Sequence, residues 1–206
     1  MQVIRFRQIP VDARIWIADG FLDEDEIAAL LAAAAARAAS SGEQDSSGLH
    51  FELPIDDAPV VRTVSRRIEA VLGFPDALGG TLRFRRYRQG EYHPAHLDVY
   101  QIGDRTLVAT AMLCLVGDAL GGETRFGRTR PAPVSLSPIR GRLTVWCNCL
   151  PDGRPDPASW HEGMPVHSGE KTTLTCFAYS PEVREPAHAK GLAPEAALPN
   201  GVRLEG

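Results

Sequence analysis

The sequence lacks the segments that would direct a chain into or across a membrane. Its longest apolar run, Ile27 to Ala39, is too short to span a bilayer and is interrupted by Arg37. The first residues, Met1 to Arg7, do not show the order of basic region, apolar run and small-residue cleavage site that a secretory signal needs. We therefore expect a cytoplasmic protein without a membrane partner.

The sequence also lacks a large excess of charge of either sign and any internal repeat. Its net charge is −4, with 22 Lys and Arg against 26 Asp and Glu. A balance of this kind provides no general attraction for a polyanion, so we expect no nucleic-acid partner.

Cysteine is scarce, and no two cysteines have the two-residue spacing that is typical of a zinc site. Each lies within an apolar or strand-like run, which favours reduced, buried thiols over metal binding. The four are Cys114, Cys147, Cys149 and Cys176.

What the sequence has is enough apolar material for one hydrophobic core. It contains 206 residues, of which 44% are hydrophobic. We expect one domain over residues 1–180, with a helical support region at 1–80 and a β-rich core at 81–180. Residues 181–206 show no clear period and are expected to form a separate tail.

Two helices are predicted in the support region. Asp23 and Glu26 have the spacing of a capping box, and the alanine-rich run that follows predicts a helix over 24–39. A second helix is predicted over 58–72, with Asp57 as its cap and Gly73 at its end. The polar segment 40–58 between them is expected to be an inert surface loop or a lid, with a short strand at 49–53.

After residue 80 the apolar period changes from helical to strand-like. Gly, Pro or Asp turns separate the runs 81–88, 91–100, 106–116, 134–136, 143–150 and 171–179, and strands are also expected within 1–22. Helices followed by many short strands predict an α+β protein with the helices packed on the outside of a β-sandwich or barrel.

One of these runs carries a metal-binding pattern. Alternation along a strand places His96 and Asp98 on the same face, with Leu97 on the other. His161, far downstream, can supply a third ligand. Two imidazoles and one carboxylate form the facial set that holds Fe(II) with open coordination positions.

Ten residues after His161, Lys171 begins the last predicted strand. A lysine in this position is either an exposed strand end or a buried cation that needs an anion. If it points inward beside a metal, a dicarboxylic co-substrate could chelate the iron with one end and pair with the ammonium at the other.

The order of these motifs resembles the catalytic domain of prolyl 4-hydroxylase-type Fe(II)/2-oxoglutarate dioxygenases. The resemblance covers roughly residues 81–180 and includes Tyr87, His96-Leu97-Asp98, the run Gly121-Gly122-Glu123-Thr124, His161 and Lys171. It implies a double-stranded β-helix, or jelly roll, with Fe(II) held by His96, Asp98 and His161. It also implies 2-oxoglutarate and O2 as co-substrates.

The resemblance further implies which residues bind 2-oxoglutarate. Lys171 matches the partner of the distal carboxylate, with Thr124 and Tyr87 as hydroxyl partners and Thr110 as a weaker candidate. The positions that meet substrate depart from the family pattern. Leu107 and Cys114 stand where an arginine and a tyrosine are common, with Arg105 displaced, and Phe177 replaces a common tryptophan. Arg105 and Phe177 are therefore the candidate substrate residues.

The resemblance implies a hydroxylase acting on an unactivated C–H, with a prolyl or other amino-acid residue in a peptide or protein as the first expected acceptor. The alternatives are a free amino acid or small natural-product intermediate, and a non-catalytic metal-binding or oxygen-responsive module. Two further histidines and a basic run are interpreted as structural. His93 is expected to cap a turn and His167 to lie in an exposed loop, while the run 83–88 is interpreted as an edge strand protected by charge.

Overall fold

The computed structural model describes residues 4–41, 43–45, 47–73, 78–103 and 105–180, so the predicted tail 181–206 lies outside the described residues. The elements of the N-terminal part are β1 (Arg7–Gln8), β2 (Ile15–Ala18), α1 (Glu24–Ser41), β3 (Glu43–Asp45), β4 (Gly48–Pro54), the short 3₁₀ turn η1 (Ile55–Asp57) and α2 (Pro59–Leu72). Those of the C-terminal part are β5 (Thr81–Tyr87), β6 (His93–His96), β7 (Gln101–Ile102), β8 (Arg105–Gly117), β9 (Leu120–Gly121), β10 (Thr124–Phe126), β11 (Val134–Leu136), β12 (Leu143–Cys147), the 3₁₀ turn η2 (Pro157–Ser159), β13 (His161–Gly163), β14 (Val166–Ser168) and β15 (Lys171–Tyr179).

Both predicted helices are present, and one of the two predicted starts is confirmed. The capping box closes at α1, where Glu26 N–H donates to Asp23 Oδ1 (2.8 Å) and Asp23 N–H donates to Glu26 Oε2 (3.3 Å). The prediction that Asp57 caps α2 is wrong. Ala58 occupies the cap without a side-chain hydrogen bond, because Pro59 begins the helix with no N–H to satisfy. The helix ends as predicted at Gly73, whose φ of 75° suits glycine.

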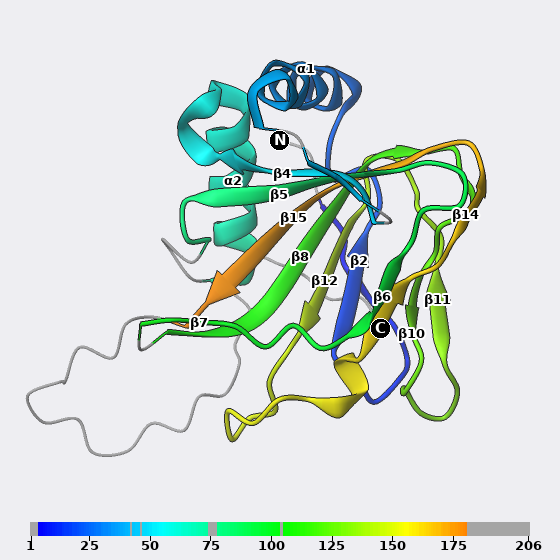
Figure 1. Cartoon of the computed structure of the whole chain (residues 1–206). Coiled ribbons are helices and arrows are strands. Elements are labelled where there is room, and N and C mark those ends of the chain that lie inside the picture. The colour runs from blue at the N-terminus through cyan, green and yellow to red at the C-terminus, as the bar shows by residue number, and fades with distance from the viewer. Residues whose placement is uncertain (1–3, 42, 46, 74–77, 104, 181–206) are drawn as a thin grey trace, which may run out of the picture.

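The strands form two main antiparallel sheets that face each other (Figure 1). The large sheet has the order β1-β2-β12-β8-β15-β5-β4-β3, with β7 beside one end of β8. The small sheet has the order β11-β10-β13-β6, and β14 pairs with β9 separately. This arrangement agrees with the predicted β-rich core and brings β6 and β13, which are far apart in sequence, into register as His96 opposite His161.

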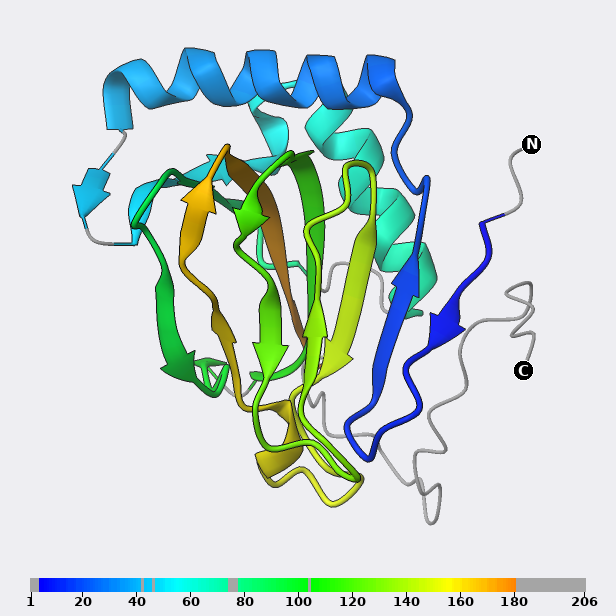
Figure 2. The same cartoon turned by 90° about the vertical axis from the view of Figure 1, so that its right-hand side faces the viewer.

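The helices cover the face of the large sheet that lies away from the small one (Figures 1 and 2). Their apolar side chains and those of the outer sheet face form the main core, because burial of apolar surface is what fixes an amphipathic helix on a sheet. The fully buried members include Ile27, Leu30, Val64, Ile68, Leu82, Leu113, Leu174 and Cys176. The inner sheet face is thereby left to line the space between the sheets.

Three expectations about individual segments are wrong. The proposed lid is mostly regular structure, because β3 and β4 form a hairpin in register with β5. The run 83–88 is no edge strand, since β5 lies between β15 and β4. The strand expected over 91–100 ends at His96, so Asp98 lies beyond it.

Two further properties of the described residues bear on the expectations from the sequence: the state of the cysteines and the hydropathy of the helices. All four cysteines are free thiols, with Cys114 and Cys176 buried and the other two half-buried. Within the described residues, no helix is both long and apolar enough to cross a membrane.

Candidate metal centre and co-substrate pocket

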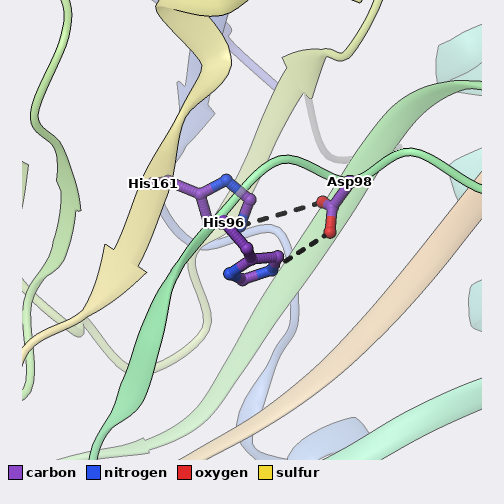
Figure 3. Close-up of side chains that lie close together, drawn as sticks. All are labelled: His96, Asp98 and His161. Carbon is purple, nitrogen blue, oxygen red and sulfur yellow. Dashed lines mark ion pairs between the residues drawn. The ribbon is translucent and has the colours of Figure 1, made fainter.

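The three predicted metal ligands converge between the two sheets. One ligand atom from each of His96, Asp98 and His161 lies within 4.8 Å of the others. His96 Nε2 is 3.3 Å from Asp98 Oδ1, and His161 Nε2 is 3.8 Å from Oδ2, so both rings are aimed at the carboxylate (Figure 3). Asp98 reaches this point from the irregular segment after β6 rather than by strand alternation.

Backbone carbonyls orient both imidazoles. His96 Nδ1 lies 2.8 Å from the Pro94 carbonyl oxygen, and His161 Nδ1 lies 2.9 Å from that of Ser159. When Nδ1–H donates to a carbonyl, the neutral ring keeps its lone pair on Nε2, which is the tautomer that a metal requires. Both Nε2 atoms face the carboxylate, so this donor set fits a divalent metal ion.

The carboxylate is held by a short chain of side chains. Thr110 Oγ1 donates to Asp98 Oδ2 (2.7 Å), and Asn148 Nδ2 donates to Thr110 Oγ1 (2.8 Å). All three side chains are buried. Thr110 also lines the cavity, where its hydroxyl donates to Asp98, and its predicted role as a 2-oxoglutarate ligand stays a prediction. Asn148 was missed, because nothing in its sequence context marks it.

The protonation of the cluster suits a cation. Burial would raise the pKa of the Asp98 carboxyl, but hydrogen bonds from His96 and Thr110 and the charge of His161 outweigh it and lower the pKa below its usual value. Burial lowers the pKa of His161. Burial opposes a rise in the pKa of His96, but its hydrogen bonds to Asp98 and to the Pro94 carbonyl outweigh burial and raise that pKa. The cluster therefore offers an ionised carboxylate, a neutral imidazole at His161 and, at His96, an imidazole that must lose its proton when a metal ion binds.

Lys171 is buried on the cavity wall, not exposed at a strand end. Its Nζ donates to Thr124 Oγ1 (3.2 Å) and lies 5.5 Å from the centre of the Tyr87 ring. Only 4% of Lys171 is exposed, and burial lowers its pKa to about 8. No carboxylate is paired with it among the described residues. A buried ammonium with hydroxyl neighbours is suited to receive an anion from a ligand.

An open cavity of about 630 Å³, its mouth included, connects the three ligands with Lys171. Three lining residues were interpreted differently from the sequence. Arg83 and Arg85 point into the cavity from β5, and His93 lies against His96 with ring centres 4.6 Å apart, so His93 is no turn cap. His167 is exposed as expected, but it lies on β14 rather than in a loop.

Of the two candidate substrate residues, Phe177 and Arg105, one lines the cavity and the other does not. Phe177 lines the cavity, 5.5 Å from the Tyr100 ring and 4.7 Å below the Arg83 guanidinium. Arg105 does not line it, because its guanidinium turns to the chain end of β15 and donates to the Ser180 carbonyl (2.8 Å). The expected substrate role of Arg105 is therefore not supported.

A protein-family profile matches the part of the chain that contains this cavity. The profile of the 2OG-Fe(II) oxygenase superfamily matches residues 58–179, which is more than half of the chain and includes every residue of the cluster. The chain belongs to the 2OG-Fe(II) oxygenase superfamily. Membership confirms the resemblance inferred from the motifs. The cofactor of this oxygenase is Fe(II), and its co-substrates are 2-oxoglutarate and O2.

Individual relatives of this oxygenase are distant. It is 28% identical over 152 residues to prolyl 4-hydroxylase 1 of Arabidopsis thaliana, which covers 66% of this chain and 53% of the plant protein. It is 26% identical over 207 residues to probable prolyl 4-hydroxylase 4 of the same plant, covering 83% of this chain and 69% of the relative. The chain thus spans about half the length of the first of these proteins.

Solved structures confirm the predicted jelly roll. The viral collagen prolyl hydroxylase of Paramecium Bursaria Chlorella virus-1, in its 2-oxoglutarate complex, has a TM-score of 0.66 at 21% identity, covering 81% of this oxygenase and 96% of that chain. A prolyl hydroxylase of Trichoplax adhaerens, in complex with a peptide fragment, has a TM-score of 0.56 at 16% identity, covering 80% and 83%. At these identities the likeness establishes the fold.

Proposed function

We propose that this oxygenase hydroxylates an unactivated C–H bond of a prolyl or other amino-acid residue in a peptide or protein. The observation that carries the proposal is one cavity that joins the His96, Asp98 and His161 cluster to the buried ammonium of Lys171. The names of the plant and viral relatives, all prolyl hydroxylases, support the acceptor class.

In this proposal each part of the cavity has a separate task. His96, Asp98 and His161 hold Fe(II), while Lys171 pairs with the distal carboxylate of 2-oxoglutarate and Thr124 and Tyr87 offer hydroxyls beside it. Bound Fe(II) and 2-oxoglutarate supply the oxidising chemistry, in which 2-oxoglutarate becomes succinate and CO2 and the second oxygen atom of O2 enters the acceptor C–H bond. The protein excludes water, fixes the keto acid and orients the target carbon.

The first experiment measures succinate release from 2-oxoglutarate with Fe(II) and O2, without any acceptor. We expect wild-type protein to release succinate slowly and His96→Ala to release none. His167→Ala is the matched control, since His167 is an exposed histidine on β14 outside the cavity, and it should behave as wild type. Wild-type protein that binds Fe(II) but releases no succinate would replace the enzyme assignment with the non-catalytic metal-binding module, and protein that binds no Fe(II) would refute both.

The second experiment identifies the acceptor. Pools of proline-containing peptides and of free amino acids are incubated with the loaded enzyme, and mass spectrometry searches for the gain of one oxygen atom. Hydroxylation confined to the free amino acids would replace the peptide acceptor with the small-molecule alternative.

A further inference from the structure

Arg85 is a charged residue of the cavity to which the proposed chemistry gives no task. It lies on the inner face of β5, directly opposite Thr173 of β15, and it is half-buried. On either side of it in the same register lie the pair Tyr87 and Lys171 and the pair Arg83 and Thr175. Arg85 therefore lies one step along the cavity wall from the co-substrate residues, toward the more exposed lining residues Arg83 and Tyr100, which we call the mouth.

The other charges that line the cavity are balanced, whereas the positive charge of Arg85 is not. Asp98 is the one carboxylate among the described lining residues. Together with the two carboxylates of 2-oxoglutarate it balances Fe(II) and the Lys171 ammonium. At the mouth, Arg83 Nε donates to Glu52 Oε1 at 2.9 Å, so this pair is neutral as well. Arg85 forms no ion pair with any residue that the structure describes.

The hydrogen bonds of Arg85 hold its guanidinium in place without neutralising it. Its Nη1 donates to Ser47 Oγ (2.8 Å), and Ser47 Oγ donates to Asp45 Oδ1 (2.6 Å). Asp45 therefore reaches Arg85 only through a hydroxyl, and it is more than half exposed, so water screens its charge. Arg85 also interacts with the Tyr87 hydroxyl: burial raises the pKa of Tyr87 to about 12, and the charge and hydrogen bond of Arg85 oppose that rise. A guanidinium has donors in a fixed planar fork, and those not used by Ser47 and Tyr87 remain for a ligand.

We propose that Arg85 binds a carboxylate of the acceptor, so that this oxygenase prefers an acceptor whose target residue carries or adjoins a negative charge. The inference rests on the proposed function. Two sources share this chemistry: an Asp or Glu side chain beside the target residue in a peptide, and the α-carboxylate of a free amino acid. The guanidinium fixes the position of the carboxylate and thereby of the target carbon.

The test measures acceptor binding to protein loaded with Mn(II) and N-oxalylglycine, which fill the metal and co-substrate positions without turnover. The probes are short peptides with a central proline followed by Asp, Asn or Lys, with L-proline and L-prolinamide as a second pair. We expect the Asp peptide, or L-proline in the second pair, to bind about tenfold more tightly than its neutral partner. The pair that shows the difference identifies the source of the carboxylate.

Variants then assign the preference to one side chain. Arg85→Gln should remove the difference, and Arg85→Glu should invert it in favour of the Lys peptide. Arg86→Gln is the matched control, because Arg86 is the next residue on β5, faces the opposite side of the sheet and does not line the cavity. It should keep the wild-type preference.

Two readouts separate failure of this inference from failure of the proposed function. Wild type and Arg86→Gln should bind 2-oxoglutarate and release succinate without acceptor to the same extent. A loss of 2-oxoglutarate binding in Arg85→Gln as large as that in Lys171→Met would place Arg85 at the co-substrate and overturn the inference. Equal binding of charged and neutral probes, or no binding of any acidic probe, would also overturn it while succinate release upheld the oxygenase. Loss of succinate release in wild type would refute the proposed function itself.

Discussion

The two faces of the large sheet are built by the same strands and are opposite in character. On the outer face Leu82, Leu113 and Leu174 are wholly buried against the helices. On the inner face Arg85, Lys171 and the Thr110 hydroxyl, from the same three strands, surround the cavity. Since side chains alternate along a strand, each strand contributes to both faces. One face stabilises the fold, and the other carries charge and hydroxyl groups that burial disfavours.

The comparison teaches that the site is held in place at a cost in stability. Burial disfavours the charged form of Lys171, and this cost appears as the lowering of its pKa to about 8. The outer face offsets this cost by apolar burial. Changes on the two faces should therefore have different signatures: outer changes alter unfolding, and inner changes alter ligand binding.

The largest expected effect on ligand binding comes from Lys171→Met, which keeps the length of the side chain and removes its charge. Loss of a buried charge-assisted partner should raise the 2-oxoglutarate requirement by at least about 30-fold, or ~2 kcal/mol. The same change should stabilise the ligand-free protein by about 1–3 kcal/mol, because an unpaired buried charge disappears. Steady-state kinetics and urea unfolding measure the two effects. A variant that is less stable and binds 2-oxoglutarate normally would contradict the assignment.

The next effect belongs to the outer face. Leu174→Ala should lower the free energy of unfolding by about 3 kcal/mol, because Leu174 is fully buried in the main core. Thr175→Ala, the neighbouring position on the cavity side, should lower it by less than about 1 kcal/mol. Denaturant melts of the two variants test the contrast, and equal destabilisation would show that the faces do not differ as described.

A smaller effect is expected from the support of the metal ligand. Thr110→Val keeps the shape of the side chain and removes the hydrogen bond to Asp98, so Fe(II) affinity should fall about tenfold. Thr110→Ser keeps the hydroxyl and should retain most of the affinity. Metal titration followed by tryptophan fluorescence measures this. At saturating Fe(II) the 2-oxoglutarate requirement should stay unchanged; a change confined to 2-oxoglutarate would support the role first predicted for Thr110.

The smallest effect is a pH dependence of co-substrate binding. The pKa of Lys171, lowered by burial to about 8, means that the ligand-free protein loses this positive charge as pH rises through 8. Between pH 7 and 8.5 the charged fraction, and with it the affinity for 2-oxoglutarate, should fall roughly fourfold. Calorimetric titration of wild type and Lys171→Met compares the two, and the variant should lack this dependence.

Protein stability should respond to the same group with the opposite sign. From about pH 8 to the ordinary lysine pKa, 10.5, the unfolded chain binds more protons than the folded one, so this group makes the ligand-free protein more stable as pH rises. Melting curves across that range, with Lys171→Met as reference, should show the gain in wild type alone.

The periodic parts of the sequence predicted the fold and much of the site geometry. Strict alternation over 171–179 placed Lys171 on one face and Leu174 on the other, as observed. Alternation is a local signal, so a single sequence contains it. The His96-Leu97-Asp98 triplet and the resemblance of the motif order indicated a metal shared with His161, and these residues do converge, although Asp98 lies beyond the strand expected to carry it.

Contacts between distant segments could not be inferred in this way. A basic run resembles a charged sheet edge, and only the pairing of β5 with both β4 and β15 shows that Arg85 faces a cavity. His93 comes to lie opposite Gly163 only through the pairing of β6 with β13. Asn148 reaches Thr110 across 38 residues of sequence, and nothing local marks that hydrogen bond. The predicted domain boundaries remain predictions.

The hairpin of β3 and β4 lies at the edge of the large sheet and contacts Arg85, whereas the metal ligands lie elsewhere in the fold. Ser47, at its turn, steadies the guanidinium of Arg85 from the outermost part of the large sheet. Turns at a sheet edge accept insertions and substitutions at little cost to the rest of a fold. If Arg85 binds the acceptor as proposed, exchange of this hairpin should alter how that guanidinium is held, while the ligands of the metal, which lie on β6, on β13 and in the segment after β6, are left as they are.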